Sequence, residues 1–256
     1  MSCTAHHEPD AHAQDKTPND SLPFPTEASC VSVQEGYARW AHTYDQTPNP
    51  LLALEERCLT PLLPDLAGKN VLDLACGTGR WLFRLLTRGA LSGGGIDLSP
   101  SMLNVGAARP AIRGRLALAD CLRLPFCTGA FDFVLCSFAL SHIGNLDAMA
   151  RELAWVIKRH GQLLMCDLHP DAYALGWRPG FRDPYGPAQI ETVYHPAESV
   201  VSCFRSHGFS IPNLYTFFFE EPERQVFFRA GRAAVFEKVC RVPAVQVYDF
   251  RRLAHD

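Results

Sequence analysis

The segment Val71–Arg80, with the sequence VLDLACGTGR, constrains the fold more than any other part of the chain. It reads as a short apolar strand, a tight turn that contains Gly77 and Gly79, and the start of a helix. Glycines at these positions permit positive φ angles and let a ligand approach the backbone closely. The free N–H groups at the start of the helix favour an anionic group such as a phosphate or a carboxylate. The segment therefore predicts a strand–turn–helix unit that binds such a ligand.

Alternating apolar strands and helices follow this segment. The expected strands are 71–75, a second strand that ends with 96–98, then 116–119, 131–138 and 162–167, and the expected helices are 80–88, 100–108 and 146–160. Gly161 is expected to close the last helix at its C′ position, after a final turn of basic residues. Alternating βαβ units predict a parallel sheet with right-handed crossovers. Two late strands, 209–220 and 242–250, lack a clear long crossover between them, so one antiparallel strand is expected.

Three segments stand apart from this alternation. Residues 1–30 are polar and lack hydrophobic periodicity, so they are predicted to be a disordered tail. Residues 31–256 are predicted to form a single domain that begins with cap helices, one carrying an aromatic stripe and one starting at Asn49-Pro50. Residues 168–195 contain five large aromatic residues and are expected to form a lid-like insertion without regular structure. The alternative is an aromatic cluster that only covers the sheet edge.

Composition and charge exclude several functional classes. The net charge of −3 argues against a strongly basic surface for nucleic acid, so no nucleic-acid partner is expected. No apolar run reaches the about 18 residues that a membrane span requires, and the N-terminal residues lack the apolar core of a secretory signal. The ten cysteines include no C-x-x-C pair, which indicates reduced thiols, no metal site and a cytoplasmic location.

Two acidic residues at predicted strand ends suit the two halves of an adenosine. Asp97 ends the strand after the glycine turn, where a carboxylate can accept hydrogen bonds from both ribose hydroxyls. Asp120 ends the next strand and can accept from the adenine amine, while the N–H of Cys121 meets a ring nitrogen. Leu82 stands where the dinucleotide fingerprint has its third glycine, which disfavours an NAD-dependent oxidoreductase without excluding it.

These segments resemble the motifs of class I S-adenosylmethionine (SAM)-dependent methyltransferases, in the branch described as methyltransferase type 11 or UbiE/BioC-like. The resemblance covers residues 37–250 and includes, in order, VLDLACGTGR, GIDLSPSML, ALADCLRLPF, FDFVLCSFALSHI and ELAWVIKRHGQLLMCDLHP. It implies an α/β, Rossmann-like fold with a seven-stranded, mostly parallel sheet and helices on both faces. The implied strand order is 3-2-1-4-5-7-6, with strand 7 antiparallel.

The same resemblance implies SAM as the cofactor and a set of residues that bind it. These are Tyr37, Tyr44, Asp73, Ala75, Gly77, Gly79, Asp97, Leu98, Met102, Asp120, Cys121 and Ser137, with Phe138 as an alternative to Ser137. The sequence departs from the family in two places. Ala75 replaces the first glycine of the turn, and the glycine-rich run 91–95 suggests that the second strand is short.

The resemblance implies methyl transfer to a small-molecule acceptor, which the aromatic insertion suggests is apolar or aromatic. His142 and His169 follow strands at the edge where ligands of such sheets bind, so each is a candidate general base. Structural roles are the alternative for both. Arg178 and Arg182 are candidates for binding a substrate carboxylate, or simply solvated. A SAM-binding module without catalytic activity is the competing function, and O-, N- and C-methylation remain equal alternatives.

Overall fold

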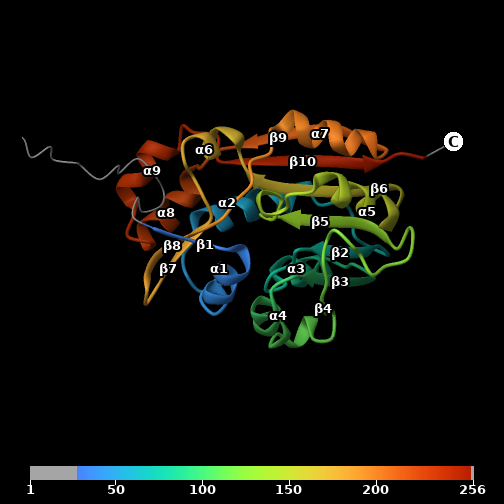
Figure 1. Cartoon of the computed structure of the whole chain (residues 1–256), viewed down its shortest axis with the longest axis horizontal. Coiled ribbons are helices and arrows are strands. Elements are labelled where there is room, and N and C mark those ends of the chain that lie inside the picture. The colour runs from blue at the N-terminus through green and yellow to red at the C-terminus, as the bar shows by residue number, and fades with distance from the viewer. Residues whose placement is uncertain (1–27, 255–256) are drawn as a thin grey trace, which may run out of the picture.

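The computed structural model describes residues 28–254, which contain a seven-stranded sheet and a smaller three-stranded sheet (Figure 1). Residues 1–27, the greater part of the predicted tail, lie outside the described residues. In the described part of the chain, no helix has both the length and the apolar character needed to cross a membrane.

The large sheet has the predicted topology. Its strands are β2 (Asn70–Leu74), β3 (Ser92–Asp97), β4 (Leu116–Leu118), β5 (Phe131–Ser137), β6 (Ile157–Leu168), β9 (Phe209–Phe217) and β10 (Val245–Arg252). They lie in the order β4-β3-β2-β5-β6-β10-β9, which is 3-2-1-4-5-7-6 when the seven strands are counted along the chain. Only β10 runs antiparallel to its neighbours β6 and β9 among these pairs. The predicted fold class is confirmed.

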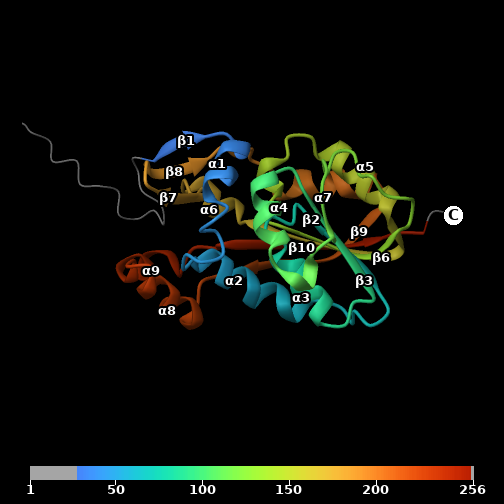
Figure 2. The same ribbon diagram turned by 90° about the horizontal axis from the view of Figure 1, so that it is seen from below.

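Helices cover both faces of this sheet (Figure 2). One face carries α5 (Leu146–Val156) and α7 (Ala197–Ser206), and the other carries α2 (Pro50–Leu59), α3 (Arg80–Thr87), α8 (Glu221–Arg229) and α9 (Ala233–Val239). The central strand β5 supplies both cores, because successive side chains point to opposite faces. Val134 packs in the core under α5, and Leu135 packs in the core under α2 and α3. This double burial explains the unbroken apolar run that the sequence shows there.

Local capping sets where the helices beside the glycine turn begin. Asn49 accepts hydrogen bonds from the backbone N–H groups of Leu51 and Leu52, and Pro50 occupies the first turn of α2. Ser99 caps α4 (Pro100–Ala107) by accepting the N–H of Met102 at 3.4 Å. Both helix starts confirm the sequence prediction.

The predicted end of α5 is wrong. The helix ends at Val156, and Ile157 adopts extended geometry and pairs with Phe131 of β5. Lys158 therefore lies in β6 rather than in a helical turn, and its ammonium group contacts Asp132 at 2.7 Å. Gly161 is not a helix C′ residue either, because it lies within β6. An added Cβ at this position would lie 2.7 Å from the side chain of Ile157, so close packing in the strand favours glycine there. Burial of Ile157 and strand pairing outweigh the local preference for helix.

The glycine-rich β3 is not shortened, contrary to the expectation. All three glycines at 93–95 belong to the strand and pair with β2. Neighbouring side chains occupy the space that side chains on β3 would need, because an added Cβ at Gly93 would lie 2.7 Å from Val71. At Gly95 the corresponding contact would be Cys76 at 2.8 Å. The glycines thus permit close packing rather than weaken the strand.

The insertion 168–195 has regular structure, so the predicted loop is wrong in this respect. It contains α6 (Pro170–Ala174), β7 (Gly180–Asp183) and β8 (Gly186–Ile190). Strand β1 (Ser29–Val31) pairs with β8, which places the last residues of the predicted disordered segment in a small sheet of order β1-β8-β7. Helix α1 (Val33–Trp40) follows β1 directly. Backbone pairing with a segment far along the chain orders these residues.

Candidate functional site

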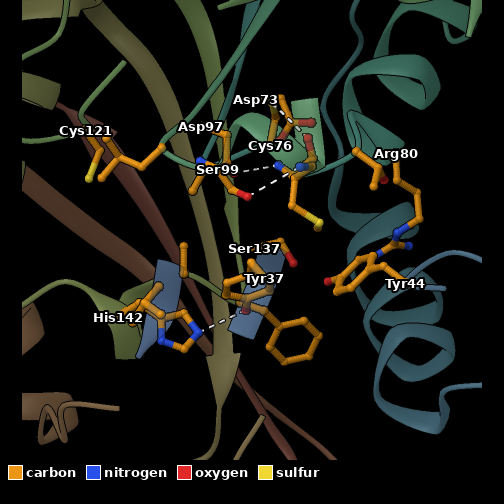
Figure 3. A pocket seen from close by; sticks show the side chains of 18 of the residues that line it. Tyr37, Tyr44, Asp73, Cys76, Arg80, Asp97, Ser99, Cys121, Ser137 and His142 are labelled. Carbon is orange, nitrogen blue, oxygen red and sulfur yellow. Dashed lines mark hydrogen bonds between the residues drawn. The ribbon is translucent and has the colours of Figure 1, made fainter. Parts of the chain in front are cut away.

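A cavity of about 970 Å³, including its open mouth, lies at the carboxyl ends of β2, β3 and β5 (Figure 3). Helix α1 and the turn after it cover one side. Eleven of the fourteen residues predicted from sequence line this cavity: Tyr37, Tyr44, Asp73, Ala75, Gly77, Asp97, Leu98, Met102, Cys121, Ser137 and His142. The other three, Gly79, Asp120 and His169, are not among its lining residues.

The glycine turn and Asp97 form one hydrogen-bonded unit. The carboxylate of Asp97 accepts the backbone N–H of Gly77 at 2.7 Å and that of Ser99 at 2.8 Å. Burial raises the pKa of Asp97, and these two N–H donors oppose the rise. Gly77 has a φ of 54°, which its lack of a side chain permits. Asp97 is therefore fixed in place with its remaining lone pairs available to a ligand.

Two residues other than glycine on the cavity wall have left-handed backbone geometry. Ala75 has a φ of 54° and Phe138 has a φ of 50°. Such angles are uncommon outside glycine and raise the local free energy. Both residues directly follow strands whose carboxyl ends open on the cavity, so the backbone turns sharply there. The departure of Ala75 from the family's glycine thus introduces local strain without blocking the cavity.

Gly79 supports the turn from outside the cavity. It is the N-cap residue of α3 with a φ of 69°, and an added Cβ would lie 2.5 Å from Ile112. Asp73, in contrast, lines the cavity and accepts the backbone N–H of Leu82 at 2.8 Å. Burial raises the pKa of Asp73 to about 7. Asp73 therefore joins β2 to α3 and also presents a titratable group to the cavity.

The predicted adenine-binding residues divide into two groups. Met102 and Cys121 line the cavity. Asp120 does not, and its carboxylate instead accepts the backbone N–H of Leu122 at 2.8 Å, which stabilises the turn after β4. The side chain direction at a strand end decides between these roles, and the sequence alone does not determine it.

His142 is hydrogen-bonded through both ring nitrogens. Nε2 lies 3.0 Å from the Tyr37 hydroxyl, and Nδ1 lies 3.1 Å from the carbonyl oxygen of Glu191. Because a carbonyl can only accept, Nδ1 carries the proton and Nε2 accepts from Tyr37. Burial lowers the pKa of His142, with the nearby carboxylate of Asp167 opposing that shift. A neutral imidazole with a basic nitrogen toward the cavity is the result.

The other candidate base, His169, has a structural position. It is the N-cap of α6, where its Nδ1 accepts the backbone N–H of Asp171 at 3.1 Å. Its Nε2 lies 3.5 Å from the hydroxyl of Thr216. Arg178 likewise bonds backbone carbonyls, at Tyr173 and Trp177, and Arg182 is exposed.

Comparison with known proteins shows which family the chain resembles. Residues 71–161 match the family described as a methyltransferase domain. The demethylmenaquinone methyltransferase of Mycobacterium tuberculosis is 36% identical over 170 residues, which is 64% of each chain. Residues 71–161 are therefore similar to methyltransferase domains. The chain spans slightly less than two thirds of the length of this relative.

Solved structures of low sequence identity share the fold of this chain. A SAM-dependent methyltransferase from Mesorhizobium loti has a TM-score of 0.64 at 21% identity, covering 80% of this chain and all of that one. A putative SAM-dependent methyltransferase from Listeria monocytogenes has a TM-score of 0.62 at 19% identity, covering 79% of this chain and all of that one.

Sequence reasoning missed an ion pair in the cavity. Glu55 of α2 is buried and accepts hydrogen bonds from Arg80, from the indole nitrogen of Trp81 at 2.7 Å and from the hydroxyl of Ser137. Arg80 is the first residue of α3. The available signal was Glu55 itself, which stands among the apolar residues of α2. Because acids are seldom buried unless they are paired, a buried glutamate there implies a partner.

A second cavity of about 420 Å³ adjoins the first and shares Tyr37, Tyr44 and Phe138 with it. Its remaining wall is mostly apolar and comes from α1, α2, the end of β6 and the start of β7. One buried carboxylate, Asp167, also lines it and accepts the backbone N–H of Ser141 at 2.8 Å. The two cavities therefore meet at residues on α1 and at the carboxyl end of β5.

Proposed function

We propose that the protein transfers a methyl group from SAM to a small-molecule acceptor. The observation that carries the proposal is the position of Asp97 beside the glycine turn. Each Asp97 oxygen already accepts one backbone N–H, from Gly77 or Ser99, and each has a further lone pair available. Two adjacent acceptors suit the two hydroxyls of a ribose.

The other lining residues fit the remaining parts of SAM. In this proposal Asp73, Ala75 and Gly77 surround the methionine moiety. Leu98, Met102 and Cys121 lie along the adenosine, Ser137 lies at the sulfonium, and Tyr37 and Tyr44 cover the cofactor. Gly79 and Asp120 hold the backbone around the site without contacting the ligand. The cavity's mixture of apolar and acidic wall is consistent with a cofactor that carries a positive sulfur.

Methyl transfer from a sulfonium is an in-line displacement in which the acceptor atom bonds the methyl carbon and the sulfur keeps the electron pair. The donor is already activated, so the protein mainly aligns the two reactants and excludes water. For a hydroxyl or amine acceptor, Nε2 of His142 acts as general base through the Tyr37 hydroxyl, which gives its proton to Nε2 and takes the proton of the acceptor. His169 has no such role in this proposal, because it caps α6 away from the cavity.

The second cavity is the natural place for the acceptor, since it meets the first near Ser137 and Phe138. Its aromatic and aliphatic wall favours a planar, apolar molecule, and the similar mycobacterial protein is named for demethylmenaquinone. The cap helices and the insertion 168–195 then act as one lid over both reactants within a single domain of residues 31–256. The free cysteines of the described residues suit a reducing compartment such as the cytoplasm.

A ligand screen followed by a transfer assay tests this function. We expect SAM and S-adenosylhomocysteine to raise the melting temperature, and NAD and NADP to leave it unchanged. A ligand at a hundred times its Kd should stabilise the protein by about 2.7 kcal/mol. Methyl-labelled SAM, incubated with a metabolite extract, should then yield a labelled product. Stabilisation by NAD alone would overturn the cofactor, and SAM binding without any transfer would favour a non-catalytic module.

A further inference from the structure

A buried ion pair lies inside the cavity, where apolar packing would otherwise suffice. The side chains of Arg80 and Glu55 are 14% and 1% exposed, and a guanidinium nitrogen of Arg80 donates to Glu55. Figure 3 shows Arg80 reaching toward the cavity beside Tyr44. Removing two charges from water has a large desolvation cost, which their mutual attraction often only offsets. Stability alone is therefore a poor explanation for this pair.

The charges on the cavity wall are unevenly distributed. Three carboxylates line it, those of Glu55, Asp73 and Asp97. Arg80 is the only arginine or lysine among the lining residues of the described chain. Burial opposes the charge of Arg80, but Glu55 and other nearby groups hold its pKa above the ordinary value, so it stays cationic. A ligand carboxylate that enters this cavity therefore has one cationic side chain, that of Arg80, with which it can form an ion pair.

We propose that Arg80 and Glu55 recognise the amino-acid end of SAM: Arg80 binds its carboxylate and Glu55 binds its ammonium group. The inference rests on the SAM site proposed above. The hydrogen bond to Glu55 uses one of the five N–H donors of Arg80, and the others can form a fork with a second carboxylate. Glu55 accepts three hydrogen bonds and has about four lone-pair sites, so it can accept one more.

The position of Glu55 gives this recognition a second consequence. Its carboxylate also accepts the hydroxyl proton of Ser137, the last residue of β5. Glu55 belongs to α2, Arg80 to α3 and Ser137 to β5, so one buried carboxylate joins three elements around the cofactor. Binding of a zwitterion there fixes the sulfur relative to the end of β5. Glu55 and Arg80 are in this way positioning residues for the methyl donor.

Truncated ligands separate the two contacts in the intact protein. Isothermal titration would compare S-adenosylhomocysteine, its decarboxylated form and 5′-methylthioadenosine, which lacks the whole amino-acid part. We expect wild type to bind S-adenosylhomocysteine at least tenfold more tightly than either truncated ligand. Arg80→Gln should lose at least tenfold for the full ligand and stay within twofold for both truncated ones. Glu55→Gln should weaken the two ligands that carry the ammonium group and leave 5′-methylthioadenosine unchanged.

Arg84→Gln is the matched control, because Arg84 lies one turn along α3 and pairs with Glu56 outside the cavity lining. It should leave all three affinities within twofold. An equal loss for all ligands in Arg80→Gln would mean a merely structural role and would overturn the inference. So would equal wild-type affinity for the full and decarboxylated ligands, a result that needs no variant to fold. Failure of wild type to bind any of the three would instead refute the SAM site itself.

Discussion

The hydroxyl of Tyr37 lies 3.0 Å from Nε2 of His142 and joins helix α1 to the end of β5. The other ring nitrogen meets the carbonyl of Glu191, which follows β8. The imidazole is thus held by two segments that are distant in sequence. Its tautomer, and therefore the nitrogen that carries the basic lone pair, is a property of the assembled fold.

The protonation state of His142 is the first prediction. Burial lowers its pKa below the ordinary 6.5, so it should titrate below that value with the neutral ring protonated on Nδ1. Nuclear magnetic resonance of protein with nitrogen-labelled histidine measures both, and His142→Asn identifies the signal. An unfolded chain takes up this proton below pH 6.5 while the native state does not, so the site loses stability as pH falls. A midpoint above 6.5 would contradict the structure.

Replacement of Asp97 by asparagine tests the ribose contact. The variant keeps the shape of the side chain but removes the charge, and hydrogen bonds to charged groups contribute about 1.5–3 kcal/mol each. We expect the affinity for S-adenosylhomocysteine to fall at least tenfold in isothermal titration. Asp120→Asn is the matched control, because Asp120 lies outside the cavity lining, and it should change affinity less than threefold. Equal losses in the two variants would restore Asp120 as a ligand contact.

The carboxyl group of Asp73 should make stability depend on pH. Burial raises its pKa from 3.8 to about 7. Between these values the unfolded chain has released the proton and the native state retains it, so rising pH lowers the free energy of unfolding. Asp73→Asn removes this contribution. The free energy of unfolding of wild type minus that of the variant should therefore decrease by a few kcal/mol at most from about pH 4 to pH 7.

Urea denaturation of both proteins across this pH range provides the measurement. The comparison isolates Asp73 because the other titrating groups are the same in the two chains. A difference that stays constant with pH would show that the Asp73 carboxyl group ionises as freely in the native state as in the unfolded chain, and a difference that grows as pH rises would show that its native pKa is lowered; either result would contradict the prediction.

Ala75→Gly should stabilise the protein. Ala75 has a φ of 54°, and glycine reaches this region without a steric penalty. The relief exceeds the greater backbone entropy that glycine loses on folding, so the free energy of unfolding should rise by up to about 1 kcal/mol. Ala154→Gly, inside α5, is the control and should lower it by about 1 kcal/mol. A destabilised Ala75→Gly protein would show that the alanine methyl group packs favourably.

The large sheet was predictable because its signals are local. The glycine turn after an apolar strand, the doubly buried run of β5 and the caps at Asn49 and Ser99 each depend on neighbours in sequence. Most of the proposed cofactor residues follow from their places at the ends of these strands.

The features that could not be predicted from the sequence depend on partners that are distant along the chain. Strand β1 is ordered by β8, and the helix before β6 stops because Ile157 pairs with β5. Glu55 acquires its role from Arg80 and Ser137, neither of which is near it in sequence. The position of Asp120 outside the cavity lining could not be predicted, because the pattern locates a strand end but not the direction of the side chain that follows.

The pairing of Val31 with Ile190 has a consequence for synthesis. The segment that covers the cofactor cavity leaves the ribosome early, yet its strand partner is made only after the five parallel strands β2 to β6. The contacts of β1 and α1 with β8 can therefore form only after the parallel strands have been made, and contacts between such distant residues form slowly. A growing chain would then complete this wall of the cavity as one of its last folding events.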